Sequence, residues 1–340
     1  MRVGLVARAM GTHGGTERVL LGFAGWLATR GDDVTVYCER AEETPAGVRV
    51  VPLAVRGFGR VTRALSLYRA STAIPVRQHD VVLGLGRTTN HHVYRAGGGS
   101  HRAWLAARGG WRPSDVVDRW LDRKALGARI VVANSEMAKD DLQRFDGLDA
   151  AKLRVVWNGV DLERFRPRDH TAGAVVGFLG TGFHRKGLAT AIRAVARIAG
   201  ARLVVVGRDA HAAQYERLAE REGARLELVG PRRDPEAFLP DFDVLVLPTR
   251  YDPFANATLE ALAAGVPVVT SARNGAAAVL PEPWMVVADP DDDRGFAAAL
   301  ERALHSDGPA LRAACRRRAE DYPAERMFTS LRTVLEEVQP

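Results

Sequence analysis

Short apolar runs alternate with longer segments of helical periodicity along most of the chain. Residues 3–7 form the first run, and a glycine-containing turn and a helix-spaced segment follow it. The apolar stripe of that helix consists of Val19, Leu20, Phe23, Trp26 and Leu27. Arg30 and Gly31 supply the cation and the glycine that commonly end a helix, and residues 34–37 predict the next strand. This order predicts a β–loop–α–β unit, which opens a doubly wound parallel sheet.

The same order of elements begins again near residue 174. Residues 174–179 predict a strand, residues 180–187 a glycine-rich loop, and the stripe from Leu188 to Ile198 a helix. Further strands are predicted at 81–83, 130–133 and 155–156, and then at 203–206, 226–229, 244–247 and 266–270. The sequence therefore predicts an α/β fold with two doubly wound Rossmann-like domains. The charged segment 166–173, which contains Pro167 and ends in glycine, is the expected linker.

Composition narrows the class of protein. The 340 residues are ample for two domains at roughly 100–200 residues each. Hydrophobic residues make up 46% and charged residues 26%, which excludes a disordered, collagen-like or coiled-coil chain. No apolar run reaches the ~18 residues of a membrane span, and the N-terminus lacks the features of a signal peptide. Cys38 and Cys315 do not make a disulfide framework, so we expect a cytoplasmic protein.

Positive charge is concentrated in one segment. Residues 49–129 hold fifteen Lys or Arg and four acids, a net charge of +11 in a chain whose total is +7. Such a field favours an anionic partner, which could be a membrane surface, a phosphorylated acceptor or nucleic acid. The alternative is a general preference for arginine codons, because the whole chain has only four lysines.

Two motifs in the second half carry candidate chemistry. Arg185 and Lys186 lie in a turn that opens a helix, where backbone N–H groups already favour an anion. The planar fork of Arg and the compact charge of Lys both suit a diphosphate, although solvated loop cations are the alternative. Asp252 and Glu260 form an acid pair with seven residues between them. One can accept hydrogen bonds from sugar hydroxyls and the other can bind a ribose diol, or they can be a helix cap and a solvated carboxylate.

The first half has two glycine loops. Gly14-Gly15-Thr16 is a second possible phosphate loop, but it does not match the dinucleotide pattern GxGxxG. Glu39, at the end of the second strand, stands where dinucleotide folds keep a ribose-binding acid, which leaves an NAD-dependent enzyme open. His101 follows three glycines and Ser100, and it suits a general base, an acceptor contact or a surface histidine on a flexible loop.

No motif predicts a metal site. His91 and His92 have no second cluster at metal-ligand spacing. Asp241-Phe242-Asp243 has a form that some sugar-transfer enzymes use for a metal, but it leads directly into a predicted buried strand. We therefore expect metal-independent chemistry.

Together these residues resemble the retaining family-4 glycosyltransferases of the GT-B fold over most of the chain. The shared motifs are Gly14-Gly15-Thr16-Glu17, Val132-Ala133-Asn134-Ser135, Val156-Trp157-Asn158-Gly159-Val160-Asp161, Gly180 with Arg185-Lys186-Gly187, Val205-Val206-Gly207, and residues 252–267. Within the family the chain is similar to the lipopolysaccharide-core glucosyltransferases in residues 180–187, 206–209 and 215–220.

The resemblance implies two Rossmann-like domains that face each other across a cleft. Residues 1–165 would form the acceptor-side domain, residues 166–324 the donor-binding domain, and a helix at 325–340 would cross back onto the first. Arg185 and Lys186 would hold the donor diphosphate, Asp252 the donor sugar and Glu260 the ribose, with Asp252, Arg185, Lys186 and His101 as catalytic residues. The other implied donor-binding residues are Gly14, Gly15, Thr16, Gly180, Gly207, Arg232, Phe254, Ala255, Asn256 and Ala257. The family usually has Glu at the position of Asp252, which leaves the identity of the sugar open.

We therefore expect a retaining hexosyltransferase that needs neither cofactor nor metal. A UDP-sugar, with glucose as the favoured hexose, would be the donor. Lipopolysaccharide core or another anionic glycan or glycolipid would be the acceptor, with peripheral contact to the anionic inner membrane through residues 49–129. A nucleotide-sugar epimerase or an NAD-dependent enzyme on a related fold is the alternative. A nucleic-acid-binding protein ranks lower, because the basic segment lacks a reader motif and a regular aromatic platform.

Overall fold

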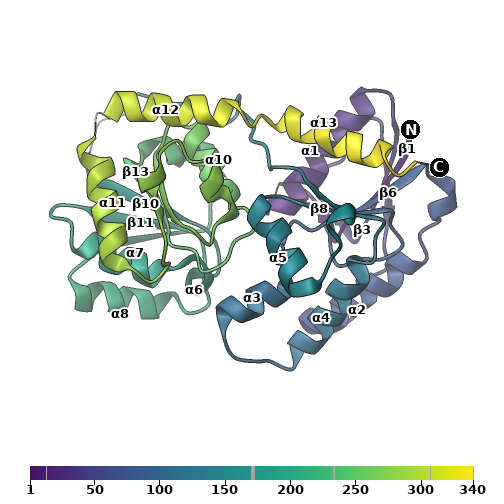
Figure 1. Cartoon of the computed structure of the whole chain (residues 1–340), viewed down its shortest axis with the longest axis horizontal. Coiled ribbons are helices and arrows are strands. Elements are labelled where there is room, and N and C mark those ends of the chain that lie inside the picture. Colours follow the sequence, from purple (N-terminus) through teal and green to yellow (C-terminus); the bar gives the residue numbers. More distant parts are fainter. Residues whose placement is uncertain (13, 170–172, 233, 307, 340) are drawn as a thin grey trace. The chain divides into compact units, whose positions relative to one another are not determined.

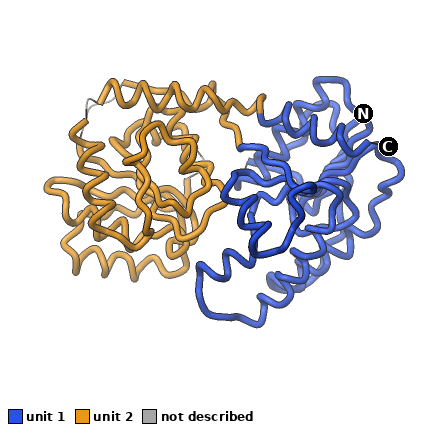
Figure 2. Tube along the Cα trace, viewed as in Figure 1, with its two compact units in different colours: residues 1–157, 327–340 blue, residues 158–326 orange. Residues whose placement is uncertain are grey.

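The computed structural model describes the chain except for residues 13, 170–172, 233, 307 and 340 (Figure 1). The chain forms two compact units (Figure 2). Unit 1 consists of Met1–Trp157 and Met327–Pro340, and unit 2 of Asn158–Arg326. The chain thus enters unit 2 upstream of the expected linker, of which residues 170–172 lie outside the described residues.

Unit 1 is built on a seven-stranded parallel sheet in the order β5-β3-β1-β6-β7-β8-β9. Its strands are β1 (Arg2–Val6), β3 (Asp33–Cys38), β5 (Val48–Pro52), β6 (Val81–Gly84), β7 (Val93–Arg95), β8 (Ile130–Ala133) and β9 (Leu153–Val155). A short parallel pair, β2 (Ala9–Met10) and β4 (Arg40–Ala41), lies outside this sheet.

Helices cover both faces of the sheet of unit 1 (Figure 1). They are α1 (Gly15–Thr29), α2 (Gly59–Thr72), α3 (His101–Arg108), α4 (Ser114–Ala125), α5 (Glu136–Asp146) and α13 (Ala324–Glu336), with 3-10 turns η1 (Val76–Gln78) and η2 (Ala150–Lys152). Phe23 of α1 and Leu331 of α13 are buried in one cluster with Val3 and Leu5 of β1. The Phe23 and Phe328 rings lie 5.7 Å apart, so apolar packing holds the C-terminal helix in unit 1.

Unit 2 repeats the design with a six-stranded parallel sheet in the order β12-β11-β10-β13-β14-β15. Its strands are β10 (Val175–Leu179), β11 (Arg202–Val206), β12 (Arg225–Gly230), β13 (Val244–Leu247), β14 (Val268–Ser271) and β15 (Val286–Val287). Its helices are α6 (Phe183–Lys186), α7 (Leu188–Ala196), α8 (Ala212–Glu222), α9 (Pro235–Phe238), α10 (Asn256–Ala263), α11 (Asp293–His305) and α12 (Gly308–Glu320), with 3-10 turns η3 (Leu239–Asp241), η4 (Gly275–Val279) and η5 (Pro283–Met285).

The predicted fold class, α/β with two doubly wound Rossmann-like sheets, is confirmed. Strands β2, β4, β5, β7 and β15 were not predicted, because β5 contains Arg49 and ends in Pro52 and the other four have only two or three residues. Among the described residues, no helix has both the length and the hydrophobicity that crossing a bilayer requires.

Candidate active site

The predicted donor-binding residues of unit 2 follow the carboxyl ends of its parallel strands. The glycine loop at 180–182 follows β10, Gly207 follows β11, and the segment 248–255 connects β13 to α10. Because β11, β10 and β13 are neighbours in a parallel sheet, these loops gather at one edge, where doubly wound folds bind their ligands.

Two glycines let the loops approach each other closely. Gly187 has a φ of +78°, and a Cβ there would overlap the carbonyl oxygen of Pro248. Gly207 has a φ of +151°, and a Cβ there would overlap the carbonyl oxygen of Gly180. No L side chain fits either place without moving backbone, so glycine is required at both.

Arg185, Lys186 and Asp252 form one ion-paired cluster. The Lys186 Nζ lies 2.8 Å from the Asp252 Oδ2, and the Arg185 Nη1 lies 2.8 Å from the same oxygen. Lys186 and Asp252 are buried, whereas the Arg185 side chain is 33% exposed. The second oxygen of Asp252 accepts from the backbone N–H of Phe254 at 3.3 Å. The structure thus joins three of the four predicted catalytic residues.

Electrostatics fix the charge states of this cluster. Burial alone would raise the pKa of Asp252, but the Lys186 and Arg185 charges outweigh it and lower the pKa to about 2. Burial lowers the pKa of Lys186, and the Asp252 charge partly offsets this effect. The Asp252 carboxylate therefore stays ionised, and it contacts both cationic side chains.

The backbone around Arg185 is held by the loop that follows β13. The Arg185 carbonyl oxygen accepts from the Arg250 N–H at 2.9 Å and from the Thr249 hydroxyl at 3.2 Å. The Arg185 Nη1 also donates to the Tyr251 carbonyl oxygen at 3.2 Å. These bonds tie the glycine loop after β10 to the loop after β13, so the cations are positioned from both sides.

The acid pair is divided between a loop and a helix. Asp252 lies in the loop, and Ala255, not Asp252, caps the start of α10, so the helix-cap interpretation does not hold. Asn256 and Ala257 open the first turn of α10, where backbone N–H groups have no acceptor within the helix. Glu260 is buried within α10, and its negative charge partly opposes the lowering of the Lys186 pKa by burial.

Two asparagines that were not predicted as site residues support this loop. Asn274 is buried; its Oδ1 accepts from the Ala255 and Ala276 N–H groups, and its Nδ2 donates to the Thr258 and Thr270 hydroxyls. Asn158 donates from Nδ2 to the Asn256 Oδ1 at 2.6 Å. The available signal for Asn274 was a polar residue in the loop after the buried strand β14, because such loops lie at the ligand edge.

Arg232, another predicted donor-binding residue, pairs with Asp234 and not with Asp252. It follows β12 and makes two hydrogen bonds, of 2.9 and 2.7 Å, with the Asp234 carboxylate. It is therefore an exposed cation with its own counter-charge, and among the described residues its contacts are with Asp234 and Phe238 rather than with the cluster around Asp252.

In unit 1 the two predicted glycine loops lie side by side. Gly14 has a φ of +88° and precedes α1, whose first residues are Gly15 and Thr16. A Cβ at Gly97 would lie 3.9 Å from the Thr16 Oγ1 and 2.9 Å from an Arg95 guanidinium nitrogen. These loops follow the β1–β2 segment and β7, so they share the carboxyl edge of the unit 1 sheet.

His101 is buried at the start of helix α3 rather than on a flexible loop. Its Nδ1 lies 3.0 Å from the Arg87 Nη2, and because a guanidinium only donates, Nδ1 accepts and the proton of the neutral ring is on Nε2. Nε2 is buried without a hydrogen-bond partner among the described residues. Burial, together with the Arg87 charge, lowers the pKa of His101 to about 4. In this state His101 is a hydrogen-bond donor with no free lone pair.

His101, Asp115 and Asp118 are the types of side chain that bind metals, and one ligand atom from each lies within 4.8 Å of the others. Arginines already pair with both carboxylates: Arg108 with Asp115 at 2.6 Å, and Arg87 and Arg60 with Asp118 at 2.8 and 2.7 Å. A cation would have to displace three guanidinium groups, so this arrangement disfavours a metal. In the Asp241-Phe242-Asp243 motif, the Asp243 carboxylate accepts hydrogen bonds from the Val175 and Gly173 N–H groups, which is a structural role.

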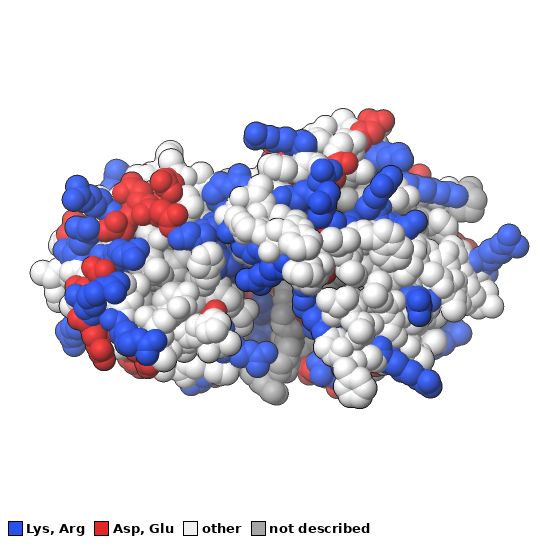
Figure 3. Space-filling view, turned by 90° about the horizontal axis from the view of Figure 1, so that it is seen from below, with Lys and Arg blue, Asp and Glu red and all other residues white. Residues whose placement is uncertain are grey.

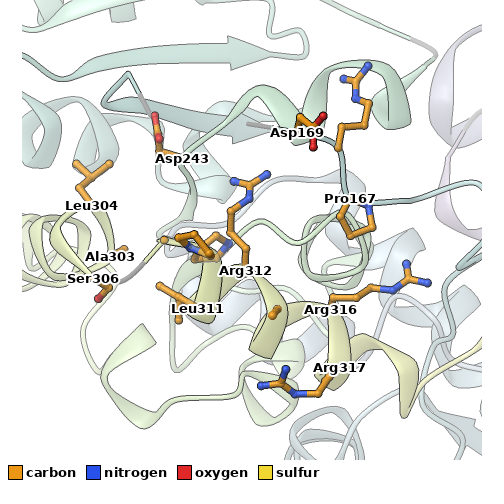
Figure 4. A pocket seen from close by; sticks show the side chains of 15 residues that line it. Pro167, Asp169, Asp243, Ala303, Leu304, Ser306, Leu311, Arg312, Arg316 and Arg317 are labelled. Atoms are coloured by element: carbon orange, nitrogen blue, oxygen red, sulfur yellow. The ribbon is translucent and has the colours of Figure 1, made fainter. Parts of the chain in front are cut away.

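A cavity of about 700 Å³ in unit 2 lies at the opposite edge of its sheet (Figure 4). Asp243 and Pro267 line it just before β13 and β14 begin. Arg312 there donates to the Phe242 and Pro240 carbonyl oxygens, and Arg316 to that of Ala263. These arginines brace the backbone, and no predicted donor-binding residue lines the cavity.

Comparison with known proteins identifies the family. Residues 13–164 match a family model described as Glycosyltransferase Family 4, and residues 173–306 match one described as Glycosyl transferases group 1. The Probable transglycosylase BTH_I0986 of Burkholderia thailandensis is 31% identical over 89% of this chain and 86% of its own length.

Solved structures show the fold. WaaG, a glycosyltransferase involved in lipopolysaccharide biosynthesis, has a TM-score of 0.83 at 20% identity, covering 98% of this chain and 99% of WaaG. Anabaena Alr3699/HepE, solved in complex with UDP and glucose, has a TM-score of 0.76 at 16% identity, covering 99% of this chain and 100% of that one. The two family models and the Burkholderia relative, which matches 89% of this chain, agree on one family. The chain is a GT-B-fold glycosyltransferase that belongs to glycosyltransferase family 4.

Proposed function

We propose that this glycosyltransferase moves a hexose, with glucose first among the candidates, from a UDP-sugar to a hydroxyl group with retention of configuration. The observation that carries this proposal is the cluster of Arg185, Lys186 and Asp252 at the carboxyl edge of the unit 2 sheet. Two cations with one buried counter-charge, beside the first turn of α10, make a place for a diphosphate.

In the proposed donor complex, phosphate oxygens take hydrogen bonds from Arg185 and from the first turn of α10. Lys186 stays near Asp252 and adds a fixed positive charge where negative charge develops on the departing nucleotide. Glu260 binds the ribose diol, and Asp252 orients the cations as well as facing the sugar.

The chemical step is a front-face displacement. The bond between the anomeric carbon and the phosphate oxygen breaks while the acceptor oxygen bonds to the same face of that carbon. The acceptor proton passes to the departing phosphate, which becomes the UDP leaving group. No carboxylate nucleophile is needed, and His101 enters as a hydrogen-bond donor rather than as a base.

The proposed chemistry needs no metal and no cofactor. Arg185 and Lys186 supply the charge stabilisation that a divalent ion gives other nucleotide-sugar enzymes. The choice of UDP is supported by Anabaena HepE, whose structure holds UDP and glucose.

The proposed acceptor is anionic, such as phosphorylated lipopolysaccharide core or another anionic glycan or glycolipid. Residues 49–129 carry a net charge of +11, which favours such an acceptor and peripheral contact with the anionic inner face of the cytoplasmic membrane. WaaG, whose fold this chain shares, is named for a part in lipopolysaccharide biosynthesis.

Thermal unfolding with UDP, ADP, GDP, UDP-glucose, UDP-N-acetylglucosamine and NAD, all in EDTA, tests the donor site. A nucleotide at about 100 times its dissociation constant adds about 2.7 kcal/mol to the free energy of unfolding, which raises the melting temperature clearly. We expect UDP and UDP-glucose to stabilise the protein. Arg185→Ala should weaken UDP binding by about thirtyfold, since losing a charge-assisted contact costs about 2 kcal/mol.

Arg193→Ala is the matched control, because Arg193 lies on α7 and its ion pair is with Glu222. It should leave UDP binding unchanged. Stabilisation by NAD alone, or equal UDP binding by wild type and Arg185→Ala, would overturn the donor site. Retention is tested on the product of UDP-glucose transfer, whose anomeric proton coupling must report an α linkage.

A further inference from the structure

The start of helix α6 is held by an acid from a neighbouring loop. Asp209 lies in the loop that follows β11, two residues beyond Gly207. Its Oδ2 accepts a hydrogen bond from the Phe183 N–H at 2.8 Å, and its Oδ1 accepts one from the His211 N–H at 2.9 Å. One half-buried carboxylate therefore joins the first residue of α6 to the backbone of the loop after β11.

Helix α6 needs such a partner because it cannot cap itself. It consists of the four residues Phe183–Lys186, and it carries both cations of the proposed diphosphate site. Its N-cap residue is Gly182, which has no side chain that could accept a hydrogen bond from the first turn. The start of a helix leaves backbone N–H groups without acceptors, and a carboxylate satisfies both their hydrogen bonds and their partial positive charge. Asp209 supplies from another loop the cap that Gly182 cannot.

The glycine loop before α6 is joined to the same neighbouring loop. The Gly180 N–H donates to the Val206 carbonyl oxygen at 3.0 Å, and the Gly182 N–H donates to that of Arg208 at 3.4 Å. With Phe183 included, three N–H groups at the entrance to α6 already have acceptors within the protein. An anion bound there would have to displace one of them.

The side chain of Phe183 anchors the same residue in the core. It is buried, and its ring packs edge to face on Phe178 and Tyr215, with ring centres 6.0 and 5.6 Å apart. Burial raises the pKa of Tyr215, and the Asp209 charge adds to this effect, which places the carboxylate near the ring cluster. Phe183 is thus fixed by its backbone and by its ring, two residues before Arg185.

Exposed ion pairs are common on unit 2 and do not single out Asp209. Figure 3 shows acidic and basic side chains intermixed on the surface of unit 2. Arg193 pairs with Glu222 and Arg202 with Glu227, and exposed pairs of this kind contribute little to stability. Asp209 differs because both of its oxygens accept from backbone N–H groups. Hydrogen bonds to a charged acceptor are about twice as strong as neutral ones, so this contact can fix a backbone segment.

We propose that Asp209 is a positioning residue for the transfer reaction, which caps α6 in place of a ligand anion and so fixes Arg185 and Lys186 for the donor diphosphate. With a protein carboxylate at the start of α6, an incoming phosphate is directed to the two cations and to the first turn of α10. The inference rests on the proposed function for the identity of the donor. It goes beyond that function in naming what orients the cations.

Nucleotide binding separates this role from a contact with the nucleoside. Asp209→Ala should weaken UDP binding by about tenfold, because α6 loses its cap and the cations lose their fixed orientation. Asp209→Asn keeps one oxygen for one of the two N–H groups and should lose about threefold. Uridine has no phosphate for the cations to hold, so its affinity should stay within about twofold of wild type in both variants.

A double-mutant cycle with Arg185→Ala tests whether Asp209 acts through the cations. In the Arg185→Ala background, Asp209→Ala should weaken UDP binding by only about threefold or less, because one of the two cations that it orients is gone. In turnover of UDP-glucose, Asp209→Ala should raise KM and also lower kcat, since the same cations stabilise the departing UDP.

Hydrogen exchange measures the cap without any nucleotide. The Phe183 amide should exchange at least about tenfold faster in Asp209→Ala than in wild type. Asp243→Ala is the matched control, because the Asp243 carboxylate also accepts from two backbone N–H groups, those of Gly173 and Val175, but directly before β13 begins. It should lower the melting temperature while Phe183 exchange and UDP affinity stay as in wild type.

Three results would each overturn the proposal by itself. Equal losses of UDP and uridine affinity in Asp209→Ala would make Asp209 a contact of the nucleoside. Full additivity with Arg185→Ala would show that Asp209 does not act through the cations, and unchanged exchange of the Phe183 amide would remove the cap. The proposed function fails in a different way: wild type would then protect the Phe183 amide but bind no nucleoside diphosphate, which removes the donor site and the positioning role with it.

Discussion

The Lys186 Nζ and the Asp252 Oδ2 lie 2.8 Å apart, and both side chains are buried. The same carboxylate oxygen also holds the Arg185 Nη1 at 2.8 Å, so one acid positions both cations of the proposed diphosphate site. Asp252 comes from the loop after β13, and the cations come from the loop after β10. The ion pair therefore joins two loops as well as two charges.

Asp252→Asn should destabilise the protein by about 3 kcal/mol, because it leaves Lys186 buried without its counter-charge. Asp252→Glu keeps the charge and should cost less. Urea unfolding at neutral pH measures both. Equal loss in the two variants would show that the fit of the side chain, not its charge, matters here.

Acid should weaken the same contact. The pKa of Asp252 is lowered from 3.8 to about 2 in the fold, so its stabilising contribution is complete above about pH 4. It is lost as the pH falls toward 2, because protonation then favours the unfolded chain. Unfolding free energies of wild type and Asp252→Asn should converge over that window.

His101 should make stability depend on pH in a higher range. The pKa of its ring falls from 6.5 to about 4 in the fold through burial and Arg87, with Asp118 and Asp115 opposing and Arg108 assisting. In the folded state the His101 ring is therefore protonated only at a lower pH than in the unfolded state. The free energy of unfolding consequently falls as the pH falls from about 6.5 to about 4. The loss is about 3 kcal/mol.

His101→Asn removes this titration and serves as the reference. The difference in unfolding free energy between wild type and His101→Asn should change by that amount between pH 7 and pH 4, in favour of the variant at low pH. Taking the difference cancels the titration of His79, His91 and His92. A constant difference would contradict the buried, neutral imidazole.

Much of the fold followed from the sequence because its signals are local. Apolar runs marked β10, β11 and β13, and the glycine at Gly187 marked the tight turn into α7. Parallel connectivity then places the loops that carry Arg185 and Asp252 at one edge of the sheet.

What could not be predicted depends on partners distant in sequence. The sequence carries no local signal that Asp118 is buried and Trp120 exposed, because the arginines that pair with Asp118, Arg60 and Arg87, come from other elements. The three glycines before His101 suggested a loop, but Ser100 caps helix α3 by accepting a hydrogen bond from the Ala103 N–H, so His101 begins a helix. Nothing in the sequence pairs Asn274 with Thr258 and Thr270, because those contacts form only after β14 has joined the sheet.

Gly187→Ala should be far more damaging than Gly200→Ala. Both glycines have nearly the same positive φ, +78° and +76°, so both substitutions carry a similar backbone strain of about 1–2 kcal/mol. A Cβ at Gly187 would overlap the Pro248 carbonyl oxygen, whereas one at Gly200 meets nothing within 4 Å. The difference between the two variants in urea unfolding therefore isolates the contact between loops, and a value near zero would contradict it.

Asn274→Ala should uncouple α10 from the sheet edge. It removes the acceptor for the Ala255 N–H and the donor for two buried hydroxyls, which should cost about 3 kcal/mol of stability. Because Ala255 caps α10, the first turn of the helix shifts as well, and UDP should bind at least about tenfold more weakly. Calorimetric titration with UDP, well below the melting temperature of the variant, measures the binding. Arg312→Lys is the control, since Arg312 braces the opposite edge of the same sheet and its loss should lower stability without changing UDP affinity.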